Sequence, residues 1–360
     1  MNCLAATNSA GAFTLLTYNV KGNGSTTWST NSAQVQAIGR QVAWLQPDVI
    51  TFNEIPQTNT FEMTNFVNAF LPGYFLATNS QGDGFIRNVI LSRFPITRST
   101  SHLHLSNLDP FGYTNSNFTR DLFEAQLAVP NFSWPLHIFT VHLKAGADAD
   151  SAAKRAAEAS AVSNFFVTTF LPANSDHPFT LSGDLNEDLA RPDSTNQPVQ
   201  RLLGPSTLLK LTTPLNPITG AELTWSIQSS LSRRIDYILP CGVLFSNIVS
   251  SQVFRTDLLS PVPLNLQSND DRTASDHLPV LTTFTNPFDT PYRLTSIAAA
   301  NPALTLSWQT ITGRQYRLEI SDDLKTWTTL AGNLNAVATN LDFATNLFPA
   351  PKCFRVYRSP

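Results

Sequence analysis

The chain has 360 residues, 42% of them hydrophobic and 10% aromatic, which is enough apolar side chain to build a packed core. Its 23 Lys and Arg residues and 26 Asp and Glu residues give a formal net charge of −3, so no overall positive charge attracts nucleic acid or an anionic membrane. No apolar run reaches the roughly 18 residues that a membrane-spanning helix needs, so we expect no membrane span.

The fraction of charged residues is low, and the cysteines are few. Only 14% of the residues are charged, and the abundance of Asn, Ser and Thr in their place favours an exported protein. We therefore expect an extracellular or periplasmic location, although Met1–Ala6 lacks the long apolar core of a signal peptide. Cys3, Cys241 and Cys353 are odd in number and far apart, which predicts neither a disulfide framework nor a zinc cluster.

Short β-rich runs alternate with helical patterns over the first 285 residues. Apolar residues at helical spacing predict a helix over Ala33–Leu45, and an Ala-rich stretch predicts another over Asp150–Phe170, capped by Asp150 or Ser151. Strands are predicted at Phe13–Val20, Asp48–Phe52, Asn88–Leu91, Leu122–Val129, Leu136–Leu143, Phe179–Ser182 and Ile235–Leu239. These elements could form a doubly wound parallel sheet, but the helices are few and the sequence has no glycine-rich phosphate loop.

The pattern changes at a proline-bearing stretch, Thr285–Pro291, which we interpret as a linker. Beyond it the chain shows short alternating runs and no convincing helix. The runs lie at Leu304–Trp308, Tyr316–Ile320, Trp327–Leu330 and Cys353–Tyr357. We therefore predict a catalytic domain over residues 12–285 and an all-β module over residues 291–360.

Polar residues follow the apolar runs at several strand ends, where loops can assemble a site. In the run Ile138–Leu143 the two-residue period of a strand turns His142 away from its apolar neighbours. The same period directs Asp184 and Asn186 to one point. Glu54 and Asn19 also stand where an apolar run stops.

These residue types suit metal-dependent hydrolysis of a phosphate ester. Mg²⁺ or Mn²⁺ takes oxygen ligands, so we expect Glu54 as the first metal ligand, with Asn19 and Asp276 close to it. His277 can act as general base if Asp236 holds its other ring nitrogen.

Three further residues complete the expected machinery. Asp184 and Asn186 would orient the attacking water and the phosphate, and His142 would donate to an oxygen on which charge develops.

The order of these motifs resembles the endonuclease/exonuclease/phosphatase superfamily, which includes deoxyribonuclease I-like nucleases, bacterial sphingomyelinases and inositol-polyphosphate phosphatases. The motifs are Thr17-Tyr18-Asn19-Val20, Asn53-Glu54-Ile55, Val141-His142-Leu143-Lys144, Gly183-Asp184-Leu185-Asn186, Arg234-Ile235-Asp236-Tyr237 and Ser275-Asp276-His277-Leu278-Pro279-Val280. The resemblance implies a four-layer α/β/β/α sandwich and makes Arg120 a phosphate-contacting residue. It also implies an acid partner for His142, which the sequence does not reveal.

The residues after Pro291 resemble the immunoglobulin- or fibronectin-type modules attached to many exported bacterial proteins. This similarity rests on Leu306-Ser307-Trp308, Tyr316-Arg317-Leu318, Trp327 and Cys353-Phe354-Arg355-Val356. It implies a small β-sandwich with an accessory role.

Simpler interpretations exist for each residue taken alone. Asn19, Asp184 and Asp236 are types that favour turns and helix caps, and it is their joint order that favours a site. His102 and His104 alternate on one strand face like a metal pair, but no third ligand is near. Arg233 and Arg234 either line a phosphate groove or flank a strand.

We therefore interpret the chain as a divalent-metal-dependent phosphodiester hydrolase, in the first place a nuclease cleaving DNA or RNA. The alternatives within the superfamily are a sphingomyelin or phospholipid phosphodiesterase and a phosphomonoesterase. A non-catalytic binding protein on a degenerate enzyme scaffold is the alternative from another class. We expect a monomer whose partner is its nucleic-acid substrate, with no obligate protein partner.

Overall fold

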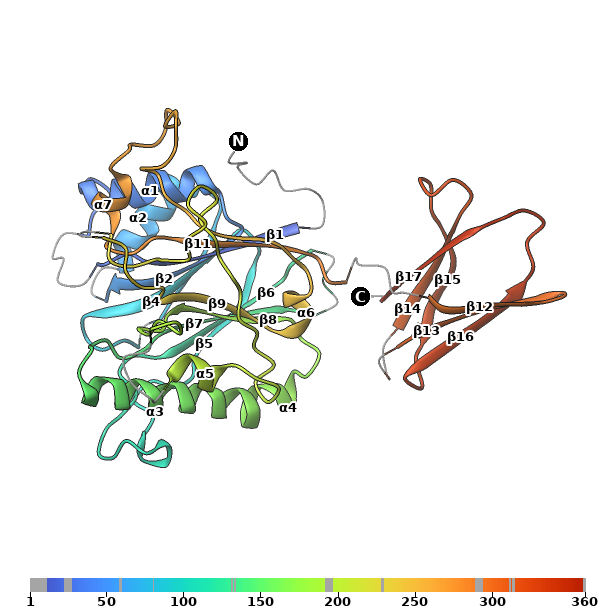
Figure 1. Ribbon diagram of the computed structural model, residues 1–360, viewed down its shortest axis with the longest axis horizontal. Coiled ribbons are helices and arrows are strands. Elements are labelled where there is room, and N and C mark those ends of the chain that lie inside the picture. Colours follow the sequence, from blue (N-terminus) through green and yellow to red (C-terminus); the bar gives the residue numbers. More distant parts are fainter. Residues whose placement is uncertain are drawn as a thin grey trace. The chain divides into compact units, whose positions relative to one another are not determined.

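The computed structural model describes residues 12–22, 28–57, 60–79, 81–130, 132, 134–191, 197–227, 230–288, 294–310, 312 and 315–358. Contacts divide the chain into two compact units. The first consists of Met1–Pro130 and Pro135–Phe284, and the second of Asn131–Trp134 and Thr285–Pro360. Figure 1 shows both units.

The first unit contains two sheets. The six-stranded sheet has the order β10 (Ile248–Val253), β11 (Val280–Thr285), β1 (Ala12–Asn19), β2 (Val49–Pro56), β4 (Ile86–Ser92) and β3 (Phe75–Thr78). The five-stranded sheet has the order β5 (Ile96–Ser101), β6 (Leu122–Leu127), β7 (Leu136–His142), β8 (Phe179–Asp184) and β9 (Asp236–Pro240). In each sheet one central pair is parallel, β1 with β2 and β7 with β8, so the carboxyl ends of both strands in a pair meet at one edge.

Helices cover the outer faces of these two sheets (Figure 1). On one side lie α1 (Ala33–Leu45), α2 (Thr60–Phe70) and α7 (Asp270–Ala274). On the other lie α3 (Ala149–Phe165), its π-helical continuation η2 (Phe166–Phe170), α4 (Leu171–Ala173) and α5 (Pro198–Leu202). The short segments η1 (Asp109–Phe111) and α6 (Gly242–Phe245) complete the helical turns described in this unit. The predicted four-layer α/β/β/α sandwich is confirmed, and the doubly wound alternative is wrong.

The helix caps show how local sequence sets the element boundaries. Ser32 caps α1, where its side chain accepts a hydrogen bond from the Val35 amide. The cap of α3 is Asp148, which accepts from the Ser151 amide, so the caps predicted at Asp150 and Ser151 are wrong. Asp150 instead lies in the first turn, where its carboxylate is favourable beside the free amides of the helix start.

Two apolar layers hold the helices on the sheets. Beneath α1 and α2 the core includes Leu16, Ile38, Phe52, Phe66 and Leu91, all at most 1% exposed. Beneath α3 and η2 the core is aromatic, and its rings meet mostly edge to face at centroid distances of 5.0–6.0 Å. Those rings are Phe139, Phe165, Phe166 and Phe170.

The second unit has two three-stranded antiparallel sheets. One has the order β12 (Leu294–Ala300), β13 (Ala303–Gln309) and β16 (Asn340–Asn346), and the other β15 (Thr328–Asn335), β14 (Gln315–Ser321) and β17 (Cys353–Arg358). Its core centres on Leu306, Trp308, Tyr316, Leu318 and Val356, each completely buried. No helix occurs among its described residues, and the predicted all-β module is confirmed as a small two-sheet unit. Across the described parts of the whole chain, no helix is both long and apolar enough to cross a membrane.

Candidate active site

The polar residues predicted at strand ends lie at one edge of the first unit. His142, the last residue of β7, pairs in register with Asp184, the last residue of β8. Asp184 in turn pairs with Asp236, the first residue of the antiparallel strand β9. Asn19 ends β1 in the other sheet, and Glu54 lies near the end of its neighbour β2. The strand registers therefore bring side chains from both sheets to one place.

A buried polar frame links the two sheets beneath this edge. Asn53 of β2 accepts a hydrogen bond from the Asp184 amide of β8 at 2.9 Å. Its own amide group donates to Asn88 Oδ1 at 2.8 Å and to Thr140 Oγ1 at 3.2 Å. Since each of these groups is buried and satisfied, the frame fixes one register between the sheets. Sequence reasoning had placed Asn53 only as a neighbour of Glu54.

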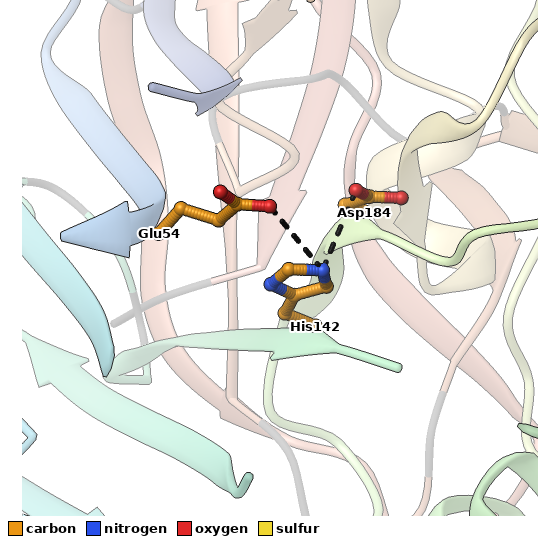
Figure 2. Close-up of side chains that lie close together, drawn as sticks. All are labelled: Glu54, His142 and Asp184. Carbon is orange, nitrogen blue, oxygen red and sulfur yellow. Dashed lines mark ion pairs between the residues drawn. The ribbon is translucent and has the colours of Figure 1, made fainter. Parts of the chain in front are cut away.

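Asn19 holds two carboxylates together. Its Nδ2 donates to Glu54 Oε1 at 3.0 Å and to Asp184 Oδ2 at 2.9 Å. His142 Nε2 lies 3.8 Å from the same Glu54 oxygen and 3.5 Å from the same Asp184 oxygen (Figure 2). The ligand atoms of Glu54, His142 and Asp184 thus all lie within 4.8 Å of one another.

This cluster has the properties of a divalent cation site. The buried Oε2 of Glu54 and both ring nitrogens of His142 lack hydrogen-bond partners among the residues that the structure describes. Leaving such groups unpaired in the interior is costly, and a cation would compensate them. Burial, together with the charges of Arg120 and His277, lowers the pKa of His142 well below its usual value, which keeps the ring neutral and able to act as a ligand. The donor set therefore fits a hard or borderline divalent ion.

Asp236 and His277 form a buried pair beside the cluster. Asp236 Oδ2 accepts a hydrogen bond from His277 Nδ1 at 2.9 Å. The other ring nitrogen, Nε2, faces Asp184 Oδ2 at 3.8 Å and Asp276 Oδ1 at 4.0 Å. Burial lowers the pKa of His277, but Asp236, Asp184 and Asp276 outweigh it and raise the pKa to about 10. The three carboxylates therefore favour the imidazolium form of the ring.

Burial acts in the opposite direction on Asp184. It raises the pKa of this carboxyl, and the negative charge of Asp236 adds to the effect, while His277 and the hydrogen bonds from Asn19 and Asn186 oppose it. A carboxylate with a raised pKa is a stronger base than an exposed one. The site thus places a carboxyl group of raised pKa beside a histidine ring whose charged form is favoured.

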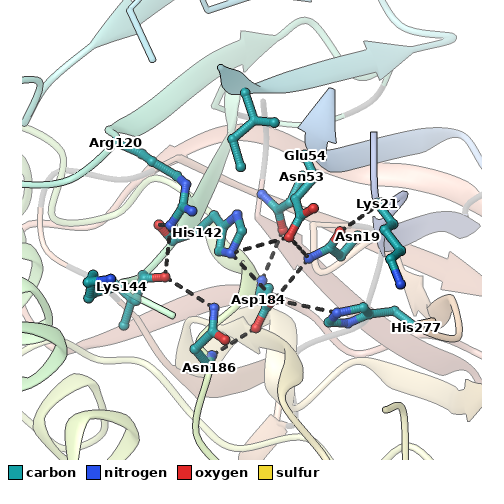
Figure 3. Close-up of polar contacts among 12 residues, drawn as sticks. Asn19, Lys21, Asn53, Glu54, Arg120, His142, Lys144, Asp184, Asn186 and His277 are labelled. Atoms are coloured by element: carbon teal, nitrogen blue, oxygen red, sulfur yellow. Dashed lines mark hydrogen bonds and ion pairs between the residues drawn. The ribbon is translucent and has the colours of Figure 1, made fainter. Parts of the chain in front are cut away.

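Asn186 lies beside Asp184 as predicted. Its backbone amide donates to Asp184 Oδ1 at 2.8 Å, and its side chain donates to the Leu143 carbonyl at 3.1 Å. Arg120 approaches from another loop, where it pairs with Asp83 at 3.2 Å. It also donates to the same Leu143 carbonyl at 3.1 Å, and Figure 3 shows it with Asn186 near His142. The structure therefore brings both predicted substrate-binding residues to the segment that follows His142.

The geometry bears on three points that the sequence raises: a metal pair of His102 and His104, which the sequence disfavours, the choice between two places for Arg234, and the prediction of Asp276 as a metal ligand. His102 is hydrogen-bonded to Glu124 at 2.7 Å. Among the described residues, neither His102 nor His104 belongs to a group that could hold a metal ion. Arg234 is buried, pairs with Glu222 and stacks on Tyr237 at 4.6 Å, so it flanks the strand. Asp276 lies outside the Glu54 cluster and pairs with Lys21, which sequence reasoning missed although it stands only two residues after Asn19.

Gly183, next to Asp184, is a position where a larger side chain should lower the stability of the fold. It has a φ of +134°, and an added Cβ would lie 2.0 Å from the Val141 carbonyl oxygen, a backbone atom that cannot move aside. We expect Gly183→Ala to lower the free energy of unfolding by about 3 kcal/mol or more, measured by urea denaturation. Gly112→Ala is the matched control, because Gly112 also has a positive φ, +85°, but open space around it. Equal losses in the two variants would show that the Val141 contact does not matter.

The comparisons with known proteins agree with this architecture. A model of the endonuclease/exonuclease/phosphatase family matches residues 16–277. No curated protein matches the chain by sequence.

Several solved structures share the fold at low identity. A truncated TDP2 from Caenorhabditis elegans is 14% identical, with a TM-score of 0.52, covering 76% of this chain and 98% of that one. A family protein from Bacteroides thetaiotaomicron is 15% identical, with a TM-score of 0.54 and coverages of 76% and 94%. The 3′ phosphatase NExo from Neisseria, bound to a product DNA hairpin, is 18% identical, with a TM-score of 0.52 and coverages of 76% and 99%. Because the family model spans most of the first unit and all six motifs except the last three residues of the final one, the chain belongs to the endonuclease/exonuclease/phosphatase family of phosphoesterases.

Proposed function

We propose that the protein is a divalent-metal-dependent phosphodiester hydrolase that cleaves DNA or RNA. The observation that carries the proposal is the buried cluster of Glu54, Asp184 and His142 next to the Asp236–His277 pair. Family membership supports hydrolysis of a phosphate ester. Among proteins of similar fold, NExo is bound to product DNA, and a D. rerio TDP2 is complexed with single-strand DNA product. These two complexes favour nucleic acid over other phosphate esters.

Glu54 and Asp184 would hold the cation, with His142 as a further neutral ligand. Asn19, which the sequence predicts beside the metal, turns its Nδ2 donor group to both carboxylates and would orient them. We infer Mg²⁺ or Mn²⁺, because carboxylate oxygens dominate this donor set. When bound, such an ion stabilises the charge that develops on phosphoryl oxygens. Arg120 and Asn186, at the edge of the same cluster, would orient the phosphate through their remaining donor groups.

Proton transfer we assign to Asp184 and His277. Both nitrogens of His277 face carboxylate oxygens, so the ring holds two protons and can donate from Nε2 to a phosphate oxygen. Asp184, whose Oδ2 atom faces the ring, can accept the proton of the attacking water. Asp236 keeps the ring charged and oriented. This assignment differs from the base role that the sequence predicts for His277.

The choice between nuclease and lipid phosphodiesterase is open to a direct experiment. Purified protein with Mg²⁺ or Mn²⁺ would be incubated with plasmid DNA, RNA, sphingomyelin vesicles and the chromogenic ester bis(p-nitrophenyl) phosphate. We expect nicking of the plasmid or degradation of the RNA at enzyme concentrations at which sphingomyelin stays intact. Faster turnover of sphingomyelin would place the protein in the lipid-cleaving branch. Binding without turnover of any of the four substrates would favour a degenerate scaffold instead.

A further inference from the structure

One carboxylate of the site is already neutralised by a side chain of the protein. Lys21 Nζ lies 3.1 Å from Asp276 Oδ2. The Lys21 side chain is 43% exposed and that of Asp276 is 20% exposed, so the pair lies where the site opens to solvent. Figure 3 shows Lys21 on the His277 side of Asn19, opposite Arg120 and Lys144.

The backbone holds both partners in place. The Lys21 amide donates to Asn19 Oδ1 at 3.0 Å. This hydrogen bond fixes Lys21, the second residue after the end of β1. Gln34 of α1 donates to the carbonyls of Lys21 and Ala274, at 3.2 Å and 3.0 Å, and so ties the end of β1 to the segment before Asp276. The Ser275 hydroxyl adds a bond to the Asn19 carbonyl at 2.7 Å. The pair therefore joins two rigid segments that also carry Asn19 and His277.

The ammonium group of Lys21 weakens the ability of Asp276 to bind a metal ion. Asp276 Oδ1 lies 4.0 Å from the Nε2 atom of His277, which itself faces Asp184. Without the ammonium group, these carboxylates would leave an uncompensated negative charge at the mouth of the site, and such a charge attracts a divalent cation. With the ammonium in contact, Asp276 is paired and is a poor ligand for a second ion.

We propose that Lys21 takes the place of a second metal ion, so that the site binds one divalent cation on the Glu54 side and uses a lysine ammonium on the His277 side. The inference rests on the proposed function, because it concerns the same metal-binding site. It assigns to Lys21 a positioning role for Asp276 and a positive charge beside the phosphate. Asp276, which the sequence predicts as a metal ligand, would instead hold Lys21 in place.

Calorimetric titration of the full chain with Mn²⁺ tests the proposal by counting bound ions. We expect one equivalent in the wild-type protein and two in Lys21→Ala, where Asp276 is released. Lys21→Gln removes the charge but keeps the length of the side chain, and should also bind two. The double variant Lys21→Ala/Asp276→Asn should return to one, because it lacks the released carboxylate. Lys210→Ala removes an exposed lysine elsewhere and should keep one equivalent.

The outcomes separate this inference from the proposed function. Two equivalents in the wild-type protein, or one in both Lys21 variants with circular dichroism unchanged, would overturn the role of Lys21 and leave the Glu54 site intact. Absence of Mn²⁺ binding in the wild-type protein would overturn the metal site and with it the proposed function. A second equivalent that persists in the double variant would show that the extra ion binds elsewhere.

Discussion

Replacing His277 by alanine is expected to lower kcat for phosphodiester cleavage by about 10²- to 10⁴-fold, the usual contribution of a positioned acid or base. The reason lies in its surroundings. The ring is 4% exposed, bonded to Asp236 at 2.9 Å, and directs its Nε2 atom towards Asp184. No water molecule can supply an oriented positive charge at that point. The rate would be measured with bis(p-nitrophenyl) phosphate and with plasmid DNA.

Asp236→Asn should approach the same loss and should also change the pH profile. Among the charges that raise the pKa of His277 to about 10, Asp236 makes the largest contribution, so its removal lowers that pKa. If the imidazolium is the working form, activity of the variant is lost as pH rises through the lowered pKa, and the alkaline limb of the profile moves to lower pH. If neutral His277 is the base, as the sequence predicts, the acidic limb moves to lower pH instead. The limb that shifts therefore decides between the two roles.

The double variant His277→Ala/Asp236→Asn tests whether the two residues act as one unit. Groups that act together are strongly non-additive, so the double variant should be scarcely slower than His277→Ala alone. Losses that multiply, in proteins whose circular dichroism is unchanged, would mean that Asp236 contributes independently of the ring.

Most site residues could be predicted from the sequence because they stand at or near strand ends that the apolar pattern marks. The runs Val49–Asn53 and Ile138–Val141 are mostly apolar, so Glu54 and His142 were identifiable at their ends. The same reasoning located Asp184 after Phe179–Ser182. Periodicity predicted the bounds of α1 correctly at both ends.

The missed elements have weaker patterns. The strands β10 and β16 place exposed or half-exposed residues at almost every position, so their alternation is not marked by buried side chains. The helix α2 carries Met63, Phe66 and Val67 at helical spacing, so it could have been predicted from the sequence. The helices predicted above do not include it. The π-helical turn after Phe165 depends on packing of η2 against the aromatic core, which no local signal encodes.

The roles of the site residues depend on distances that no sequence pattern contains. The acid partner expected for His142 is an example. No such partner is found among the described residues, because neither ring nitrogen of His142 has a hydrogen-bond partner there. The Lys21–Asp276 pair is another, since its members are 255 residues apart and meet only through the fold. The charge on His277 likewise follows from three carboxylates that come from different segments.

In the proposed mechanism, a divalent cation on Glu54 and its neighbours drives hydrolysis. Glu54→Gln is the most direct test, because glutamine keeps the size and the hydrogen bond to Asn19 but removes the charge of the ligand. Metal catalysis is worth several kcal/mol, so the variant should lose about 10³-fold or more in kcat.

The measurement is plasmid cleavage by the wild-type protein and Glu54→Gln after prolonged chelation, before and after Mg²⁺ or Mn²⁺ is returned. We predict no cleavage by either chelated protein, full recovery of the wild-type protein with metal, and no recovery of the variant beyond about one part in 10³. Full activity of the chelated wild-type protein, or wild-type recovery of Glu54→Gln, would contradict the account.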